Sequence, residues 1–361
     1  MSKYQLQRTF YKKLLRPLLF RFDSESVHNY LTYLGERGEN LNWLLESQYK
    51  FSNRSLAKTV LGVSFENPIG LSAGFDYDGH LAKVMKHVGF GFNTIGTVTA
   101  KPYEGNKAPR LVRLVESGSI LVNKGFKSSG AKEVEKRLDK KDLRGHTVGI
   151  SVGSSNLPEV NTINKAIEDY LFTFNVFSKK SYVKYFELNI SCPNTVLTES
   201  FVEQKYFKRL IKELRRLDLR QPVFVKMPNE IDLSIAHGLV RVSLKEEIRG
   251  FIFSNLVKNR SNKCLVASEL EKVKDLKGNF SGKPTFENSN RLIRSTRKKF
   301  GKDVAIIGCG GVFNPVDALE KFKAGADLVQ LITGMIFEGP QIAGDINNSI
   351  WKARLGLLQP S

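Results

Sequence analysis

Eight short runs of apolar and β-branched residues recur along this chain, and each is followed by a turn and then by a helical pattern. Strands that alternate with helices indicate parallel β-α units. Eight units in succession predict an α/β fold, the (β/α)8 or TIM barrel, which takes about 250 residues. The predicted strands span residues 70–74, 92–96, 148–152, 185–190, 223–227, 251–254, 304–308 and 328–332. Predicted helical intervals include residues 79–88, 201–217 and 315–324.

An open, doubly wound sheet is the alternative arrangement of these elements, but no G-x-G-x-x-G motif follows the first predicted strand. The chain has 361 residues, which leaves room for a barrel and an appendage. We expect a small N-terminal amphipathic helical extension at residues 1–50 and the barrel at residues 51–361.

The first 22 residues carry several lysines and arginines and no acidic residue, and their apolar residues recur at helical spacing. Pro17 is expected to break or kink this helix. Asp23 and Ser24 then cap a second helix that ends at Gly35. The predicted apolar face of that helix comprises Val27, Tyr30, Leu31 and Leu34. Helices of this kind can lie on an anionic membrane or pack on the barrel, and the pattern alone leaves both open.

The overall charge narrows the choice of partners. Basic residues exceed acidic ones by 20, which favours anionic partners such as phosphates, carboxylates and acidic lipids. The aromatic interleaving of an RNA-binding motif is absent, so we expect no nucleic acid. Cys192, Cys264 and Cys309 lie far apart without metal-like spacing, which suits a reducing cytosol and argues against disulfides and a metal site. The sequence shows neither a spanning segment nor a signal peptide.

Barrel enzymes carry their functional groups at the carboxyl ends of the strands. The richest such end is N-I-S-C-P-N-T at residues 189–195, in which Pro193 prevents a helix and Cys192 can move a proton near neutral pH. Lys226 ends a strand that should be buried, so its ammonium needs a partner. Glycine turns follow strands seven and eight, with Gly282 upstream, as in the phosphate sites of barrels.

Together these residues resemble the dihydroorotate dehydrogenases, most closely the class 2, quinone-linked branch. The resemblance runs from about residue 15 to residue 350. It rests jointly on R-P-L-L-F (16–20), D-S-E-S-V-H (23–28), N-P-I-G-L-S-A-G (67–74), G-F-G (89–91), I-G-T-V-T (95–99), P-R-L (109–111), N-I-S-C-P-N-T (189–195), S-G-K-P (281–284) and I-I-G-C-G-G (306–311).

The resemblance implies a barrel that binds FMN, oxidises dihydroorotate to orotate for pyrimidine synthesis and passes electrons to a quinone. Cys192 falls on the position of the catalytic base. Residues similar to the family's FMN contacts are Ala73, Gly74, Thr97, Ser151, Asn189, Lys226, Ser254, Gly282, Gly310, Gly311, Thr333 and Gly334. Residues at substrate positions are Tyr77, Asn123, Lys124, Gly125, Phe126, Asn189, Asn194 and Asn255.

Several positions depart from the class 2 pattern. Cys192 stands where class 2 enzymes have serine and class 1 enzymes have cysteine. The other departures are Tyr77 for lysine, Val122 for asparagine, Asn123 for arginine, Ser151 for asparagine and Leu256 for threonine. Because these changes remove charge from the substrate site, we hypothesise that Lys124 or Lys127 supplies it.

Three hypotheses follow. The first is a quinone-dependent dihydroorotate dehydrogenase, a monomer or homodimer attached peripherally to the cytoplasmic side of the cell membrane through its N-terminal helices. The second keeps the barrel and FMN but changes the small cyclic substrate, or changes the acceptor to fumarate or a nicotinamide. The third is a basic binding barrel without catalysis, which would leave Cys192 and Lys226 without a purpose.

Overall fold

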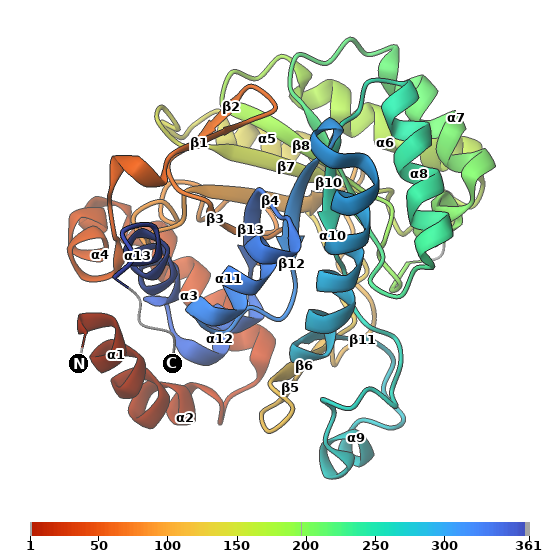
Figure 1. Cartoon of the computed structure of the whole chain (residues 1–361). Coiled ribbons are helices and arrows are strands. Elements are labelled where there is room, and N and C mark those ends of the chain that lie inside the picture. Colours follow the sequence, from red (N-terminus) through yellow and green to blue (C-terminus); the bar gives the residue numbers. More distant parts are fainter. Residues whose placement is uncertain (1, 196, 358–361) are drawn as a thin grey trace.

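The computed structural model describes residues 2–195 and 197–357 and contains a closed barrel of eight parallel strands. The barrel confirms the predicted (β/α)8 fold (Figure 1). Its strands, in their order around the barrel, are β3 (Ile69–Leu71), β4 (Phe92–Val98), β7 (Val148–Val152), β8 (Val183–Asn189), β9 (Val223–Met227), β10 (Gly250–Phe253), β12 (Ala305–Cys309) and β13 (Leu328–Leu331). Each one coincides with a predicted apolar run to within a few residues.

Amphipathic helices surround the barrel. Helix α7 shows the pattern: Phe207, Leu210, Ile211 and Leu214 are buried at helical spacing, while lysines and arginines occupy the other face. The helices around the barrel are α5 (Ala131–Leu138), α6 (Ile163–Ser178), α7 (Gln204–Arg215), α8 (Leu233–Lys245), α10 (Phe286–Phe300), α11 (Pro315–Ala324), α12 (Thr333–Glu338) and α13 (Ile342–Arg354), while α9 (Ala267–Lys272) stands apart from the barrel (Figure 1). The helix predicted at residues 79–88 is wrong, because consecutive turns occupy that interval.

A hairpin of β1 (Lys58–Val60) and β2 (Val63–Phe65) lies at the end of the barrel opposite the N-terminal helices (Figure 1). Phe65 is buried against Phe92 and Tyr185, with ring centroids 5.0 and 6.0 Å away. These aromatic contacts fill the amino-terminal end of the barrel. They leave the carboxyl ends of the strands as the open side.

A polar layer lies inside the barrel above these aromatic side chains. The carboxylate of Glu187 is fully buried and accepts hydrogen bonds from Thr94 and Gln330, both at 2.7 Å. Thr94 also contacts the hydroxyl of Tyr185 at 2.6 Å. The bonds from Thr94 and Gln330 both go to Oε1 of Glu187, while its Oε2 and the Oε1 of Gln330 are buried without a hydrogen-bond partner among the described residues.

A small antiparallel sheet stands over the open end of the barrel. Its strands are β5 (Leu111–Leu114), β6 (Ser119–Val122) and β11 (Asn279–Gly282), in the order β11-β6-β5. The sheet brings the segment after β6 close to the ends of the barrel strands. Asn194, which follows β8, donates to the carbonyl oxygen of Val122 at 3.0 Å.

The N-terminal helices lie beside this open end (Figure 1). They are α1 (Lys3–Phe10), a π-helical segment (Tyr11–Leu15), α2 (Arg16–Leu19), α3 (Ser24–Arg37) and α4 (Asn42–Tyr49). Polar contacts hold them to the barrel: Glu338 accepts from Arg8 at 2.5 Å and from Lys12 at 3.1 Å, and Tyr11 donates to the carbonyl of Ile336 at 2.7 Å.

One detail of this segment differs from the prediction. Around Pro17 the regular α-helix is interrupted as expected: a π-helical segment precedes it, and Pro17 lies in the first turn of α2, where the missing N–H costs little. Asp23 does cap α3, accepting from the backbone N–H of Ser26 at 2.8 Å. However, α3 continues through Gly35 to Arg37. A glycine fits at this interior position because a Cβ there would be 2.6 Å from the side chain of Leu81.

Candidate active site

Three adjacent strands bring predicted site residues together. Asn189, at the end of β8, is 4% exposed, and its amide donates to the hydroxyl of Thr97 at 3.0 Å. That hydroxyl lies 3.0 Å from the Ser151 hydroxyl on β7. The amide oxygen of Asn189 accepts from the backbone N–H and the hydroxyl of Ser191. This bonding fixes the Asn189 carboxamide at the mouth of the barrel.

Lys226 stands next to Asn189 in the register of β8 and β9. Its side chain is buried, and its Nζ donates to the hydroxyl of Ser72 at 3.2 Å. Among the described residues, Lys226 forms no ion pair. Burying an ammonium without a counter-charge is costly. The position is therefore suited to an anionic or electron-rich group.

A small cavity of about 90 Å³ adjoins Lys226. A Cβ on Gly310 would lie 2.4 Å from the Thr285 hydroxyl, and one on Gly334 would lie 1.9 Å from the carbonyl oxygen of Val312. The predicted cofactor residues on the cavity wall are Ala73, Lys226, Ser254, Gly282, Gly310, Gly311, Thr333 and Gly334. A wall built from glycine turns exposes backbone N–H groups, which is the chemistry of a phosphate site.

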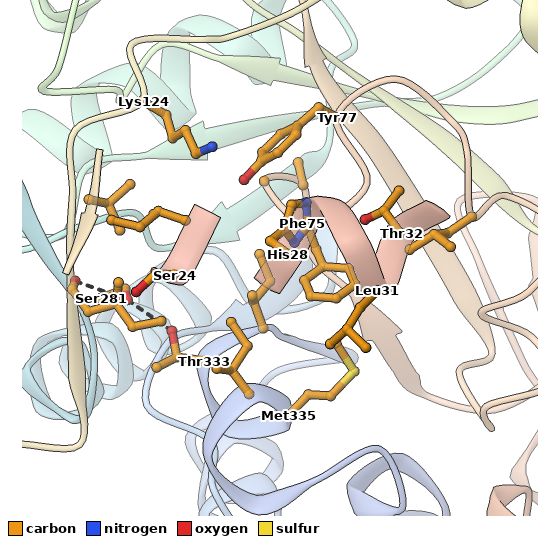
Figure 2. A pocket seen from close by; sticks show the side chains of 18 of the residues that line it. Ser24, His28, Leu31, Thr32, Phe75, Tyr77, Lys124, Ser281, Thr333 and Met335 are labelled. Carbon is orange, nitrogen blue, oxygen red and sulfur yellow. Dashed lines mark hydrogen bonds between the residues drawn. The ribbon is translucent and has the colours of Figure 1, made fainter. Parts of the chain in front are cut away.

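A larger cavity of about 540 Å³ begins at the same strand ends and reaches the N-terminal helices (Figure 2). Predicted site residues on its wall are Ala73, Gly74, Tyr77, Thr97, Lys124, Gly125, Phe126, Asn189, Cys192, Asn194, Lys226, Asn255 and Thr333. The far wall is mostly apolar and includes Leu15, Leu31 and Met335. The two cavities share wall residues such as Lys226 and Thr333, so they lie next to each other.

Two predicted residues lie outside both walls. Ser151 is behind Thr97 and reaches the cavity only through that hydroxyl. Asn123 turns away, and its amide oxygen accepts from Asn106 at 2.9 Å. Asn106 also donates to the carbonyl of Asn194 at 3.0 Å, so it ties the turn after β6 to the loop after β8.

Cys192 lies on the cavity wall and is 7% exposed. Burial raises the pKa of its thiol to about 12, and the backbone N–H of Asn194 and the charge of Lys226 offset only part of this. The thiol is therefore protonated at neutral pH. A base at this position becomes active as the pH rises.

The turn after β6 carries the charge nearest to Tyr77. Lys124 is 7% exposed, and its Nζ lies 4.7 Å from the centroid of the Tyr77 ring (Figure 2). The same Nζ donates to Oε1 of Glu25 on α3 at 2.7 Å. A residue of the N-terminal segment thus reaches the predicted substrate side of the cavity.

His28 also enters the cavity from α3 and packs between two aromatic rings. Its ring centroid lies 4.9 Å from that of Phe75 and 5.1 Å from that of Tyr77. Burial, and then the charge of Lys124, lower the pKa of His28 to about 4. The imidazole is therefore neutral at pH 7 and can both donate and accept one hydrogen bond.

Comparison with known proteins identifies this arrangement. The family model for dihydroorotate dehydrogenase matches residues 55–353. The chain belongs to the dihydroorotate dehydrogenase family. It is 35% identical over 350 residues to a protein of Christiangramia forsetii named dihydroorotate dehydrogenase (quinone), covering 94% of this chain and 98% of that protein. The protein of the same name from Bartonella henselae is 34% identical and covers 93% of this chain and 90% of its own length.

A solved structure agrees. The crystal structure of dihydroorotate dehydrogenase from Eimeria tenella in complex with ferulenol superposes with a TM-score of 0.82 at 25% identity. The match covers 93% of each chain.

Dihydroorotate dehydrogenases use a flavin, and the residues at the strand ends fit one. The glycines at 310 and 334 leave no room for a Cβ beside the small cavity, which suits close approach of a phosphate to the backbone. Lys226 provides a buried positive charge that lacks a protein counter-ion among the described residues. Both features are explained by an anionic cofactor that spans the two cavities.

Some residues at the candidate site were not predicted from the sequence. Glu25 and His28 follow the capping residue Asp23, and helix capping alone accounts for that motif. Asn229 was also missed; it donates to the hydroxyl of Ser254 at 2.6 Å and holds it beside the small cavity. Nothing local distinguishes Asn229, because its partners lie at Ser254 and Thr285, far along the chain.

Most of the exposed large apolar side chains of the described residues lie in the N-terminal helices. They are Leu6, Phe10, Leu14, Leu15, Leu18, Phe22, Tyr30, Leu31, Tyr33, Leu34, Leu41, Trp43 and Leu44. No helix in the described part of the chain is both long enough and apolar enough to span a membrane.

Proposed function

We propose that this protein oxidises dihydroorotate to orotate in pyrimidine synthesis and delivers the electrons to a quinone. The observation that carries the proposal is the continuous cavity, which joins the polar strand ends at Cys192 and Lys226 to an apolar wall built by the N-terminal helices. A polar substrate suits the first part, and an apolar acceptor suits the second. The relatives described above are named dihydroorotate dehydrogenase (quinone), which agrees with this reaction and this acceptor.

The cofactor that we propose is FMN. The small glycine-lined cavity would hold its single phosphate, with Gly310, Gly311 and Gly334 offering backbone N–H groups. Thr97, Asn189 and Lys226 would hydrogen-bond the ring system. Bound there, FMN would supply the hydride acceptor for C6 of dihydroorotate and the electron donor for the quinone.

Cys192 is the proposed base. Its thiolate would remove the proton from C5 of the substrate, in keeping with its place on the cavity wall beside Asn194. The buried, apolar surroundings that raise the thiol pKa also make the thiolate a strong base once it forms.

The substrate ring would be held by carboxamides. Asn189, Asn194 and Asn255 all line the cavity. Asn194 is itself held by Asn279, whose amide donates to Oδ1 of Asn194 at 2.6 Å. Lys124, with Gly125 and Phe126 of the same turn, would face the substrate carboxylate in place of the lysine that Tyr77 replaces.

The N-terminal helices would admit the quinone and hold the protein at the cytoplasmic face of the membrane. Their exposed apolar side chains are flanked by basic residues such as Lys13 and Arg21. Each basic residue near an anionic membrane surface contributes roughly 1 kcal/mol to binding. Flotation with anionic liposomes at low salt tests this, and a chain that stays entirely in the dense fraction contradicts it.

The decisive experiment is an absorption spectrum of the purified protein followed by anaerobic addition of dihydroorotate. We expect a flavin spectrum that bleaches and that a soluble quinone restores. A flavin spectrum that dihydroorotate leaves unchanged contradicts the proposed substrate and favours another small cyclic compound, in line with the apolar Val122 and Leu256 on the cavity wall. Recovery with fumarate or a nicotinamide, but not with quinone, contradicts the proposed acceptor.

A further inference from the structure

One carboxylate of the N-terminal segment gathers three cations of the barrel. Glu25 Oε2 accepts from Arg110 at 2.9 Å, while Glu25 Oε1 lies 2.7 Å from Lys124 Nζ and 3.4 Å from Lys127 Nζ. Although burial raises it, the hydrogen bonds from Lys124 and Arg110 bring the pKa of Glu25 down to about 2. The cluster therefore keeps an excess of positive charge beside the cavity.

The three cations are not equivalent. The Lys124 side chain is 9% exposed, whereas those of Arg110 and Lys127 are 21% and 28% exposed. Lys124 also lines the cavity that contains Cys192 and Asn189, and Figure 2 shows its Nζ directed toward the cavity beside Tyr77. It is the member of the cluster best placed to meet a negative group of a bound ligand.

Lys124 has donors to spare for such a group. An ammonium carries three donors. Glu25 takes one, and the face of the Tyr77 ring lies near the ammonium. Within the described residues, no further hydrogen-bond acceptor contacts Lys124 Nζ. A ligand carboxylate could therefore bind without displacing Glu25.

We infer that Glu25 is a positioning residue of the substrate site: it holds the Lys124 ammonium at the cavity wall, where that ammonium binds the substrate's carboxylate. This inference rests on the proposed function. The N-terminal segment then contributes to substrate recognition as well as to the path of the acceptor.

The surroundings explain why Lys124 needs this partner. Burial lowers the pKa of Lys124, Glu25 raises it, and the charges of Lys127 and Arg110 lower it again. Without Glu25, the remaining influences all favour the neutral amine. The repulsion from Lys127 and Arg110 would also drive the flexible Lys124 side chain away from the cavity wall.

Two ligands can distinguish recognition of the substrate's charge from a purely structural role of Glu25. They are orotate, which carries a carboxylate, and orotamide, in which a neutral carboxamide replaces it. Each is titrated into the flavin-loaded protein, and binding is followed through the flavin spectrum. We expect Lys124→Met to weaken orotate binding by about 30-fold and Glu25→Gln by about 10-fold, as for a lost charge-assisted hydrogen bond. Orotamide binding should change by less than about 2-fold in both variants, and Glu25→Asp should restore most of the orotate affinity.

Glu338→Gln is the matched control, because Glu338 also joins the N-terminal segment to the barrel, through Arg8 and Lys12. It should affect orotate and orotamide equally. If Glu25→Gln weakens the binding of orotate and orotamide equally, Glu25 only holds the N-terminal segment to the rest of the protein, and the inference is overturned. If Glu25→Gln binds orotate more tightly, Glu25 competes with the substrate carboxylate for Lys124, and the inference is overturned too. If the wild-type protein binds neither ligand, the proposed function itself fails. If the variants bind each ligand as tightly as the wild-type protein does, only the inference fails.

Discussion

The two ends of the main cavity are built in different ways. At the strand ends, side chains such as Asn189 and Lys226 project from the barrel itself, and glycine turns set the shape of the wall. At the N-terminal helices, the wall consists of apolar side chains such as Leu31, which is 43% exposed. The shape of the barrel end depends on backbone geometry, so we expect even one added methyl group at these glycines to disrupt it. The helical end depends on separate side-chain contacts, so substitutions there should have graded effects.

The largest effect is expected where a glycine turn shapes the barrel end. In Gly334→Ala, the new Cβ would lie 1.9 Å from the carbonyl of Val312, so the turn must move. We expect a folded protein that has lost nearly all of its flavin, measured as the ratio of visible to ultraviolet absorbance. Gly62→Asn is the control: it lies in the β1–β2 turn with φ of 78° and open space around it, and it should retain full flavin content.

Next in size is the loss of the proposed base. Cys192→Ala should lower kcat by about 10²- to 10⁴-fold while the flavin spectrum persists. In the wild-type protein, the protonated thiol predicts a rate that rises about tenfold per pH unit across the neutral range, because only the thiolate acts. Stopped-flow reduction by dihydroorotate measures both effects. A flat pH profile would show that another group accepts the proton.

A smaller and selective effect is expected at the helical end. Leu31→Asn should raise the KM for a quinone by about 10-fold, since it places a polar amide on an apolar wall. Reduction of the flavin by dihydroorotate should be unchanged. Leu355→Asn provides the control, because Leu355 is 54% exposed and lies outside the cavity wall. Equal losses in both half-reactions would mean that the two ends of the cavity are not separable.

The smallest predicted effect concerns the pH dependence of stability. His28 has a pKa of about 4 in the folded protein, below its unfolded value, so the unfolded chain binds more protons between these values. Stability should therefore fall as the pH drops from 7 to 5, by about 1–2 kcal/mol more than in His28→Asn. Urea unfolding of the two proteins at both pH values measures the difference. Equal losses in the two proteins would show that His28 has the same pKa in the folded and the unfolded chain.

Much of the barrel could be predicted because its information is local. Each strand is a short apolar run, and α11 matches the predicted residues 315–324. The same holds for the barrel side of the site, where Thr97, Asn189 and Lys226 follow strands whose ends must converge. The error at Gly35 shows the limit. Glycine often follows the end of a helix, but here it lies inside one, at a position where the distant Leu81 leaves little room for a Cβ.

The helical end of the site was harder to predict because its contacts join remote segments. Glu25 meets Arg110 and Lys124 across some 85 to 99 residues of sequence. A capping motif explained the residues around Asp23 fully, so nothing in the pattern called for a second role. The burial of the Cys192 thiol was equally hidden, because it depends on how several loops close over the barrel.

The first N-terminal helices have the reverse of the usual surface pattern: Arg8 and Lys12 face the barrel, while Leu6, Phe10 and Leu14 face outward. For the purified protein in detergent-free buffer, this apolar face can be buried only by contact with a second copy of the chain. Self-association should therefore grow with protein concentration and with added sulfate, and mild detergent should reverse it. The practical consequence is that apparent size during purification should vary with the solvent around these helices.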